Sequence, residues 1–91
     1  MTGKFEMGVL VATPGALAAL RVSGQSPVEF LRRHVAGDWG DVDGHDHKAN
    51  QIALREGGRL MSSYSTRKCE VLWIITEADR SSTCILLSCE Y

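Results

Sequence analysis

The chain has 91 residues, 44% of them hydrophobic, with 10 Lys and Arg against 11 Asp and Glu and a net charge of −1. This length supports one hydrophobic core, so we expect a single domain over residues 1–91. The near-neutral charge argues against a protein that coats nucleic acid, and no apolar run reaches the roughly 18–20 residues of a membrane span.

The first half of the chain predicts three helices. Each of the pairs at 13–14 and 26–27 is a hydroxyl residue followed by proline, which suits a helix cap and a first-turn position that needs no N–H donor. The pairs predict one helix over 14–23 and a second from Pro27 to a stop at Gly37. A third helix is expected from about Asp46 to the glycines at 57–58.

The second half predicts β-strands, because its residues are richer in β-branched and aromatic types and lie between short polar turns. The expected strands are 59–65, 70–77 and 82–88. Along the middle strand, alternation places Val71, Trp73 and Ile75 on one face and Leu72 and Ile74 on the other. We therefore expect an α+β fold, with N-terminal helices packed on one face of a C-terminal antiparallel meander of three or more strands.

Residues 38–46, here called the acidic loop, combine four carboxylates with a tryptophan and two glycines. A compact negative patch around an exposed aromatic side chain would fit a basic protein surface, because opposite charge speeds encounter and the aromatic ring supplies buried area. The candidate partner-binding residues are Asp38, Trp39, Asp41, Asp43 and Asp46. Alternatively, Trp39 packs in the core against Phe30, and Asp46 caps the third helix.

Donors for a divalent metal lie at Asp41, Asp43, His45, Asp46 and His47, but their spacing matches neither an EF-hand loop nor a tetrahedral zinc site. We expect no metal and no cofactor. The three cysteines, Cys69, Cys84 and Cys89, form no CxxC pair and have no partner histidine nearby in sequence. We expect reduced thiols in a bacterial cytoplasm, without a role as nucleophiles.

Four runs cover nearly the whole chain: ATPGALAAL, SPVEFLRRHVAGDWGDVD, KANQIALREGGRLMSSY and LWIITEADRSSTCILLSCEY. They resemble a family of small uncharacterised, plasmid-related proteins carried on bacterial plasmids, integrative elements and prophages. The resemblance implies a mobile-element setting and implies no particular reaction. The chain departs from the family pattern at Cys69, where a glycine is expected, and at residues 88–89, where a proline-containing ending is expected.

The β half is also similar to the barnase-like ribonuclease superfamily, in segments 59–63, 73–76 and 79–80 and at Thr83. That resemblance implies a catalytic set of Arg59, Glu77 and Arg80 converging on one concave face of the sheet. Arg80 stands where the superfamily pattern offers a catalytic histidine. Without that histidine, transfer to the ribose 2′-OH loses its general acid.

We therefore expect a non-enzymatic accessory protein of a mobile element that binds and inhibits a host defence or nucleic-acid-handling complex, as anti-CRISPR proteins do. Its expected partner is a host protein or ribonucleoprotein complex with a basic surface, and no membrane. The prediction also allows a homodimer that forms through a sheet edge or face. The alternatives are a barnase-like RNase or toxin acting on RNA, and a structural accessory protein.

Overall fold

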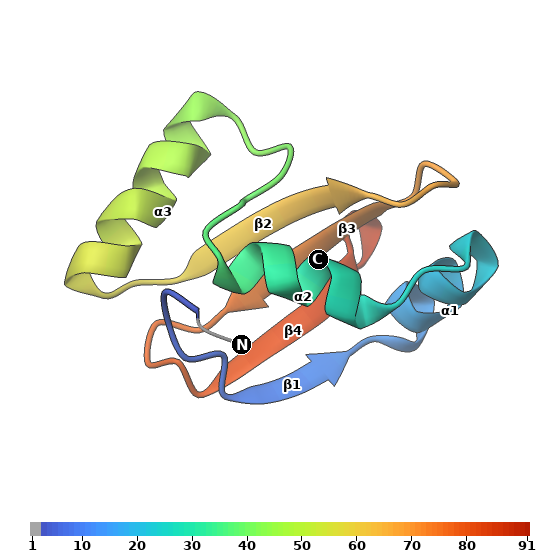
Figure 1. Ribbon diagram of the computed structural model, residues 1–91, viewed down its shortest axis with the longest axis horizontal. Helices are drawn as coiled ribbons and strands as arrows, with labels where there is room; N and C mark the ends of the chain where they lie inside the picture. Colours follow the sequence, from blue (N-terminus) through green and yellow to red (C-terminus); the bar gives the residue numbers. More distant parts are fainter. Residues whose placement is uncertain (1–2) are drawn as a thin grey trace.

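The computed structural model describes residues 3–91, which form a four-stranded sheet with three α-helices (Figure 1). The strand order across the sheet is β1-β4-β3-β2. Strands β2, β3 and β4 form an antiparallel meander, whereas β1 pairs with β4 in parallel. The elements, in chain order, are β1 (Val9–Ala12), α1 (Pro14–Ser23), α2 (Pro27–Val35), α3 (Gly44–Glu56), β2 (Leu60–Ser65), β3 (Val71–Thr76), β4 (Ser82–Leu87) and the short 3₁₀ helix η1 (Ser88–Glu90).

The α+β class and the three-stranded meander are confirmed, but the prediction of a purely antiparallel sheet is wrong. Strand β1 adds a parallel edge in residues 9–12, where no strand was predicted. The reason is its length: four residues, VLVA, are too few for a periodicity to distinguish a strand from a helix lead-in. Its partner strand lies at the other end of the chain.

The helix starts follow from side-chain caps. Thr13 accepts a hydrogen bond from the backbone N–H of Ala16 at 3.1 Å, and Ser26 accepts one from Val28 at 3.2 Å. The third helix begins earlier than predicted, because Asp43, and not Asp46, is its cap. The Asp43 carboxylate accepts from the N–H of Asp46 at 2.8 Å. The predicted capping role of Asp46 is therefore wrong.

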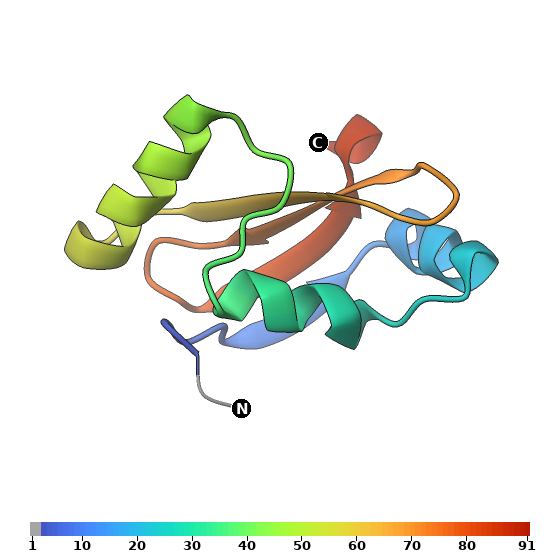
Figure 2. The same ribbon diagram turned by 45° about the horizontal axis from the view of Figure 1, so that its top comes forward.

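Helices α1 and α2 cover one face of the sheet (Figure 2). The predicted alternation along β3 is confirmed on this face, because Leu72 and Ile74 are fully buried. They join a core cluster with residues of both helices and of β2 and β4: Ala16, Leu20, Phe30, Leu31, Tyr64 and Ile85. A second, smaller cluster lies near α3 and contains Trp39, Ala53 and Leu60.

The free edge of β2 is occupied by other parts of the chain. Asn50 of α3 bonds both backbone groups of Met61, donating to its carbonyl at 2.8 Å and accepting from its N–H at 3.1 Å. The backbone of the acidic loop does the same for Ser63, whose N–H donates to Trp39 O at 3.0 Å and whose carbonyl accepts from Asp41 N at 2.7 Å. This edge of the sheet therefore has few backbone groups left for another strand.

Among residues 3–91, no helix has both the length and the apolar character needed to cross a membrane.

Candidate functional site

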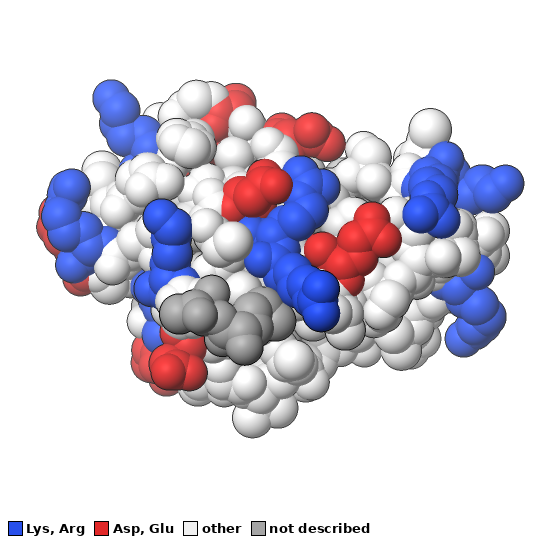
Figure 3. Space-filling view, in the orientation of Figure 1, with Lys and Arg blue, Asp and Glu red and all other residues white. Residues whose placement is uncertain are grey.

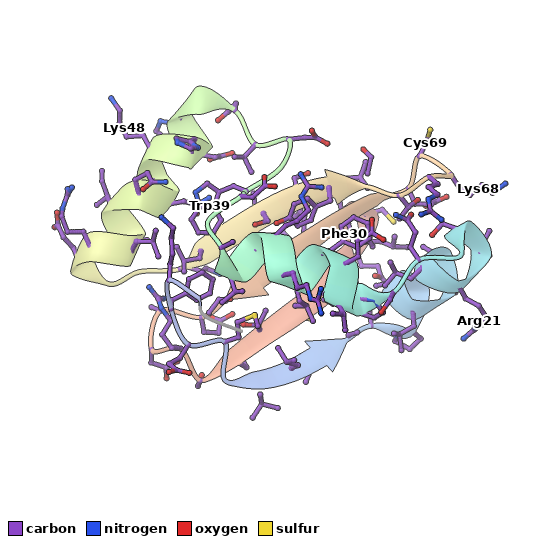
Figure 4. The ribbon with its side chains drawn as sticks, in the orientation of Figure 1. Arg21, Phe30, Trp39, Lys48, Lys68 and Cys69 are labelled. Atoms are coloured by element: carbon purple, nitrogen blue, oxygen red, sulfur yellow. The ribbon has the colours of Figure 1, made fainter. Side chains whose placement is uncertain are left out.

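Trp39 lies in the core and not on the surface. Its side chain is 2% exposed, and its ring stacks on Phe5 at a centroid distance of 6.2 Å and meets His34 edge-on at 5.6 Å. The hypothesis of an exposed aromatic anchor is therefore wrong, and the alternative of a core tryptophan is confirmed. The expected neighbour is also wrong, because Phe30 belongs to the other cluster and packs on Tyr64. Figure 4 shows Phe30 and Trp39 at separate places in the fold.

The carboxylates of the acidic loop differ in how they are used. Asp38 is paired with Arg33 at 2.8 Å and also accepts from the backbone N–H of Gly40 at 3.1 Å. The hydrogen bond from Arg33 holds the pKa of Asp38 below its ordinary value, with burial acting against it. Asp38 therefore stabilises the turn after α2 and contributes little net negative charge to a binding surface.

Asp41, Asp43 and Asp46 remain as the acidic surface of the loop. Asp41 and Asp43 are exposed, and Asp46 is half-buried in the first turn of α3. The loop that carries them is held in place by the buried ring of Trp39 and by the backbone bonds to Ser63. Three of the five predicted partner-binding residues thus lie close along one fixed segment, while Trp39 and Asp38 serve the fold.

Within residues 3–91, no three His, Cys, Asp or Glu side chains are close enough together to hold a metal ion. His45 and His47 are both exposed on α3. The sequence pattern that suggested metal donors therefore does not become a cluster in three dimensions.

The predicted ribonuclease residues come together only in part. Arg59 and Glu77 form an ion pair of 3.9 Å, and Arg59 also donates to the Tyr91 hydroxyl at 2.9 Å. The ring of Tyr91 in turn meets Trp73 edge-on at 5.3 Å. Trp73 lies in β3, Arg59 directly precedes β2, Glu77 follows β3 and Tyr91 follows η1. Both side chains of the ion pair are about half exposed.

Among residues 3–91, Arg80 forms no ion pair with the Glu77 carboxylate, so a catalytic set of Arg59, Glu77 and Arg80 stays a prediction. The Arg80 guanidinium donates to the carbonyls of Gly58 at 2.5 Å and Ala53 at 3.2 Å, near the end of α3. It also donates to the carbonyls of Glu77 and Ala78 within its own turn. These bonds tie the β3–β4 turn to α3, and the positive charge lies at the helix end that favours it.

Cys69 and Arg80 share an unusual backbone conformation, with φ of 65° and 62° respectively. We expect Cys69→Gly to raise the free energy of unfolding by about 0.5–1 kcal/mol, because glycine adopts this conformation without steric cost. Arg80→Gly relieves the same backbone but should lower the free energy of unfolding by roughly 2–3 kcal/mol, because its carbonyl bonds are lost. Urea unfolding of both variants measures the difference. Equal effects would show that the Arg80 bonds contribute nothing.

The three thiols are unpaired, in agreement with the prediction. Cys69 and Cys89 are exposed, and Cys84 is half-buried in β4. Burial raises the pKa of the Cys84 thiol, which favours the unreactive protonated form.

Sequence reasoning missed a buried polar network around His34, which is fully buried. One ring nitrogen lies 2.6 Å from the Ser62 hydroxyl, and the other lies 2.9 Å from the Thr76 hydroxyl. Thr76 continues to Thr83 at 2.7 Å, and Thr83 donates to the carbonyl of Met7 at 2.7 Å. The signal available in the sequence was one hydroxyl residue on the inner face of each meander strand: Ser62, Thr76 and Thr83.

The His34 network is closed to solvent and links elements that are far apart in sequence. Burial lowers the pKa of His34 to about 4, so the ring is neutral near pH 7. Since both ring nitrogens face protein hydroxyls, the network positions α2 on the sheet and gives no access to a substrate.

Two hollows lie on the surface of the described residues. One, of about 380 Å³, is lined by residues 3–7 and Val35. The other, of about 260 Å³, lies between α1 and the β2–β3 turn and includes Lys68, Glu70 and Leu87 in its wall. The predicted catalytic and partner-binding residues line neither hollow.

Comparisons with known proteins give no relative: no protein-family model matches the chain, and neither does any curated protein or solved structure.

Proposed function

We propose that this protein is a non-enzymatic accessory protein of a mobile element, which binds a basic surface of a host defence or nucleic-acid-handling complex and inhibits it. The proposed location is the cytoplasm of the bacterial host. The mobile-element setting rests on the resemblance of the four sequence runs. The binding role rests on the acidic surface of Asp41, Asp43 and Asp46.

The observation that carries the proposal is the fixed presentation of these carboxylates. The loop is anchored on both sides, by Trp39 in the core and by the cap of Asp43 on α3. A segment that is already ordered loses little entropy when it binds, and clustered charge of one sign speeds encounter with the opposite charge. Over the helical face, by contrast, acidic and basic side chains lie side by side (Figure 3).

The proposal predicts that the double variant Asp41→Ser/Asp43→Ser associates with its partner about threefold to tenfold more slowly at low salt. Serine at position 43 retains a capping oxygen, so the free energy of unfolding should change by less than about 1 kcal/mol. The control is Glu6→Ser/Glu70→Ser, which removes the same charge from exposed positions elsewhere. Pull-down from host lysate with mass spectrometry identifies the partner, and surface plasmon resonance then measures the association rates.

Equal association rates for the two double variants would remove the acidic surface from the proposal. A second candidate, the RNase or toxin, is favoured by the half-exposed pair of Arg59 and Glu77 beside Tyr91. Cleavage of RNA by the purified protein that is abolished in Glu77→Gln would replace the binding proposal with this one. A structural accessory role predicts neither cleavage nor a captured host complex.

A further inference from the structure

Strand β1 is the open edge of the sheet. Val9 donates its N–H to Ser81 O, and Thr13 donates to Ile85 O, each at 3.0 Å. Backbone groups of successive strand residues point to opposite sides, so Val9, Val11 and Thr13 face β4. The N–H and C=O groups of Leu10 and Ala12 therefore face away from the sheet, where no other described strand lies.

The side chains of β1 are apolar and exposed. Val9 is 66% exposed, Leu10 51% and Val11 47%. The stretch 7–20 contains no charged residue, and the surface over β1 shows no acidic or basic side chain (Figure 3). Edge strands are usually protected by lysine, proline, a bulge or a covering segment. Among residues 3–91, β1 has none of these, whereas the β2 edge is covered by Asn50 and the acidic loop.

We propose that β1 pairs antiparallel with β1 of a second copy of this chain, joining the two sheets across a two-fold axis. Gly8 has a φ of 67°, so the strand conformation begins at Val9. The register that uses the outward groups of both Leu10 and Ala12 places the axis at Val11. Leu10 then exchanges hydrogen bonds with Ala12 of the second copy, and the two Val11 side chains are neighbours.

The chemistry of the edge favours a second copy over the basic partner of the proposed function. A basic surface would find no carboxylate on β1, whereas a second β1 matches both its apolar side chains and its unpaired backbone. Two copies of net charge −1 repel each other weakly. Four-residue strands bury less than the roughly 800 Å² per partner of a standard interface, so we expect a dissociation constant of about 10–100 μM.

Sedimentation equilibrium between about 5 μM and 1 mM tests the proposal. The wild-type mass should rise from that of the 10.0 kDa monomer toward twice that value. Val11→Lys should weaken association at least tenfold, because the lysines would face each other at the axis. The matched control is Val22→Lys, at a valine that is 70% exposed on α1. A monomeric wild type, or a dimer that survives Val11→Lys, would overturn the proposal.

A cross-link tests the register without depending on the folding of the lysine variant. In a variant with all three native cysteines replaced by serine or alanine, Val11→Cys should form a disulfide-linked dimer on mild oxidation. Directly opposed residues of this pair type have Cα atoms about 4.5 Å apart, within the range that a disulfide spans. Val22→Cys is the control. Equal cross-linking at the two positions would contradict the proposed pairing.

The dimer proposal does not rest on the acidic surface. Loss of host binding in Asp41→Ser/Asp43→Ser would leave the dimer intact, and loss of the dimer in Val11→Lys would leave the acidic surface intact.

Discussion

Trp39→Ala should lower the free energy of unfolding by about 3–5 kcal/mol, because it leaves a large cavity in the cluster beneath α3. The ring is 2% exposed and packs with Ala53, Leu60 and Phe5. For a chain of this size the loss is a large share of the total stability. Urea unfolding followed by circular dichroism measures it.

Two further variants test whether the loss of stability in Trp39→Ala comes from the cavity that it leaves. Trp73→Ala removes the same side chain from a half-buried position beside Tyr91 and should cost less, about 1–2 kcal/mol. Trp39→Phe keeps an aromatic ring and removes an indole N–H that has no hydrogen-bond partner among residues 3–91, so its cost should stay below about 1.5 kcal/mol. If Trp39→Ala cost no more than Trp73→Ala, the assignment of Trp39 to the core would be contradicted.

The second large effect is a loss of stability in mild acid that depends on His34. Its pKa is lowered from 6.5 to about 4 by burial, so the unfolded chain binds a proton at a pH where the folded chain does not. Stability is therefore full above pH 6.5 and falls as the pH drops from 6.5 toward 4. The linkage relation gives a loss of about 2 kcal/mol between pH 7 and pH 5. Urea midpoints across this range measure the slope.

His34→Gln provides the test of that assignment, because glutamine keeps polar atoms near Ser62 and Thr76 but does not titrate. The variant should be less stable at pH 7 and should lose most of the slope between pH 7 and pH 5. An unchanged slope in His34→Gln would assign the acid sensitivity to other groups.

The features that sequence reasoning predicted well depend on local interactions. The caps at Thr13 and Ser26 bond within three residues along the chain, so a four-residue pattern holds the whole signal. The meander was equally accessible, because β2, β3 and β4 follow one another through short turns. Strand β1 was missed because its pairing with β4 is invisible to any local pattern.

The predictions for site residues were wrong where segments distant in sequence contact those residues. The composition around Trp39 indicates a solvent-exposed loop, but Phe5 and Leu60 bring the core to it. The sequence around Arg80 is typical of a turn. The carbonyls of Ala53 and Gly58 that accept hydrogen bonds from its guanidinium belong to a distant part of the chain. Asp41 and Asp43 remained accessible because the loop presents them outward.

The parallel pairing of β1 with β4 has a consequence for synthesis on the ribosome. Val9 pairs with Ser82, so β1 leaves the ribosome roughly 70 residues before its partner strand exists, an interval of about 4–14 s at ordinary elongation rates. During that time both edges of an apolar strand are unpaired. The sheet is complete only when β4 has been synthesised and pairs with β1. Folding of β1 therefore depends on the last strand, and until then β1 is a defined segment for chaperones to bind.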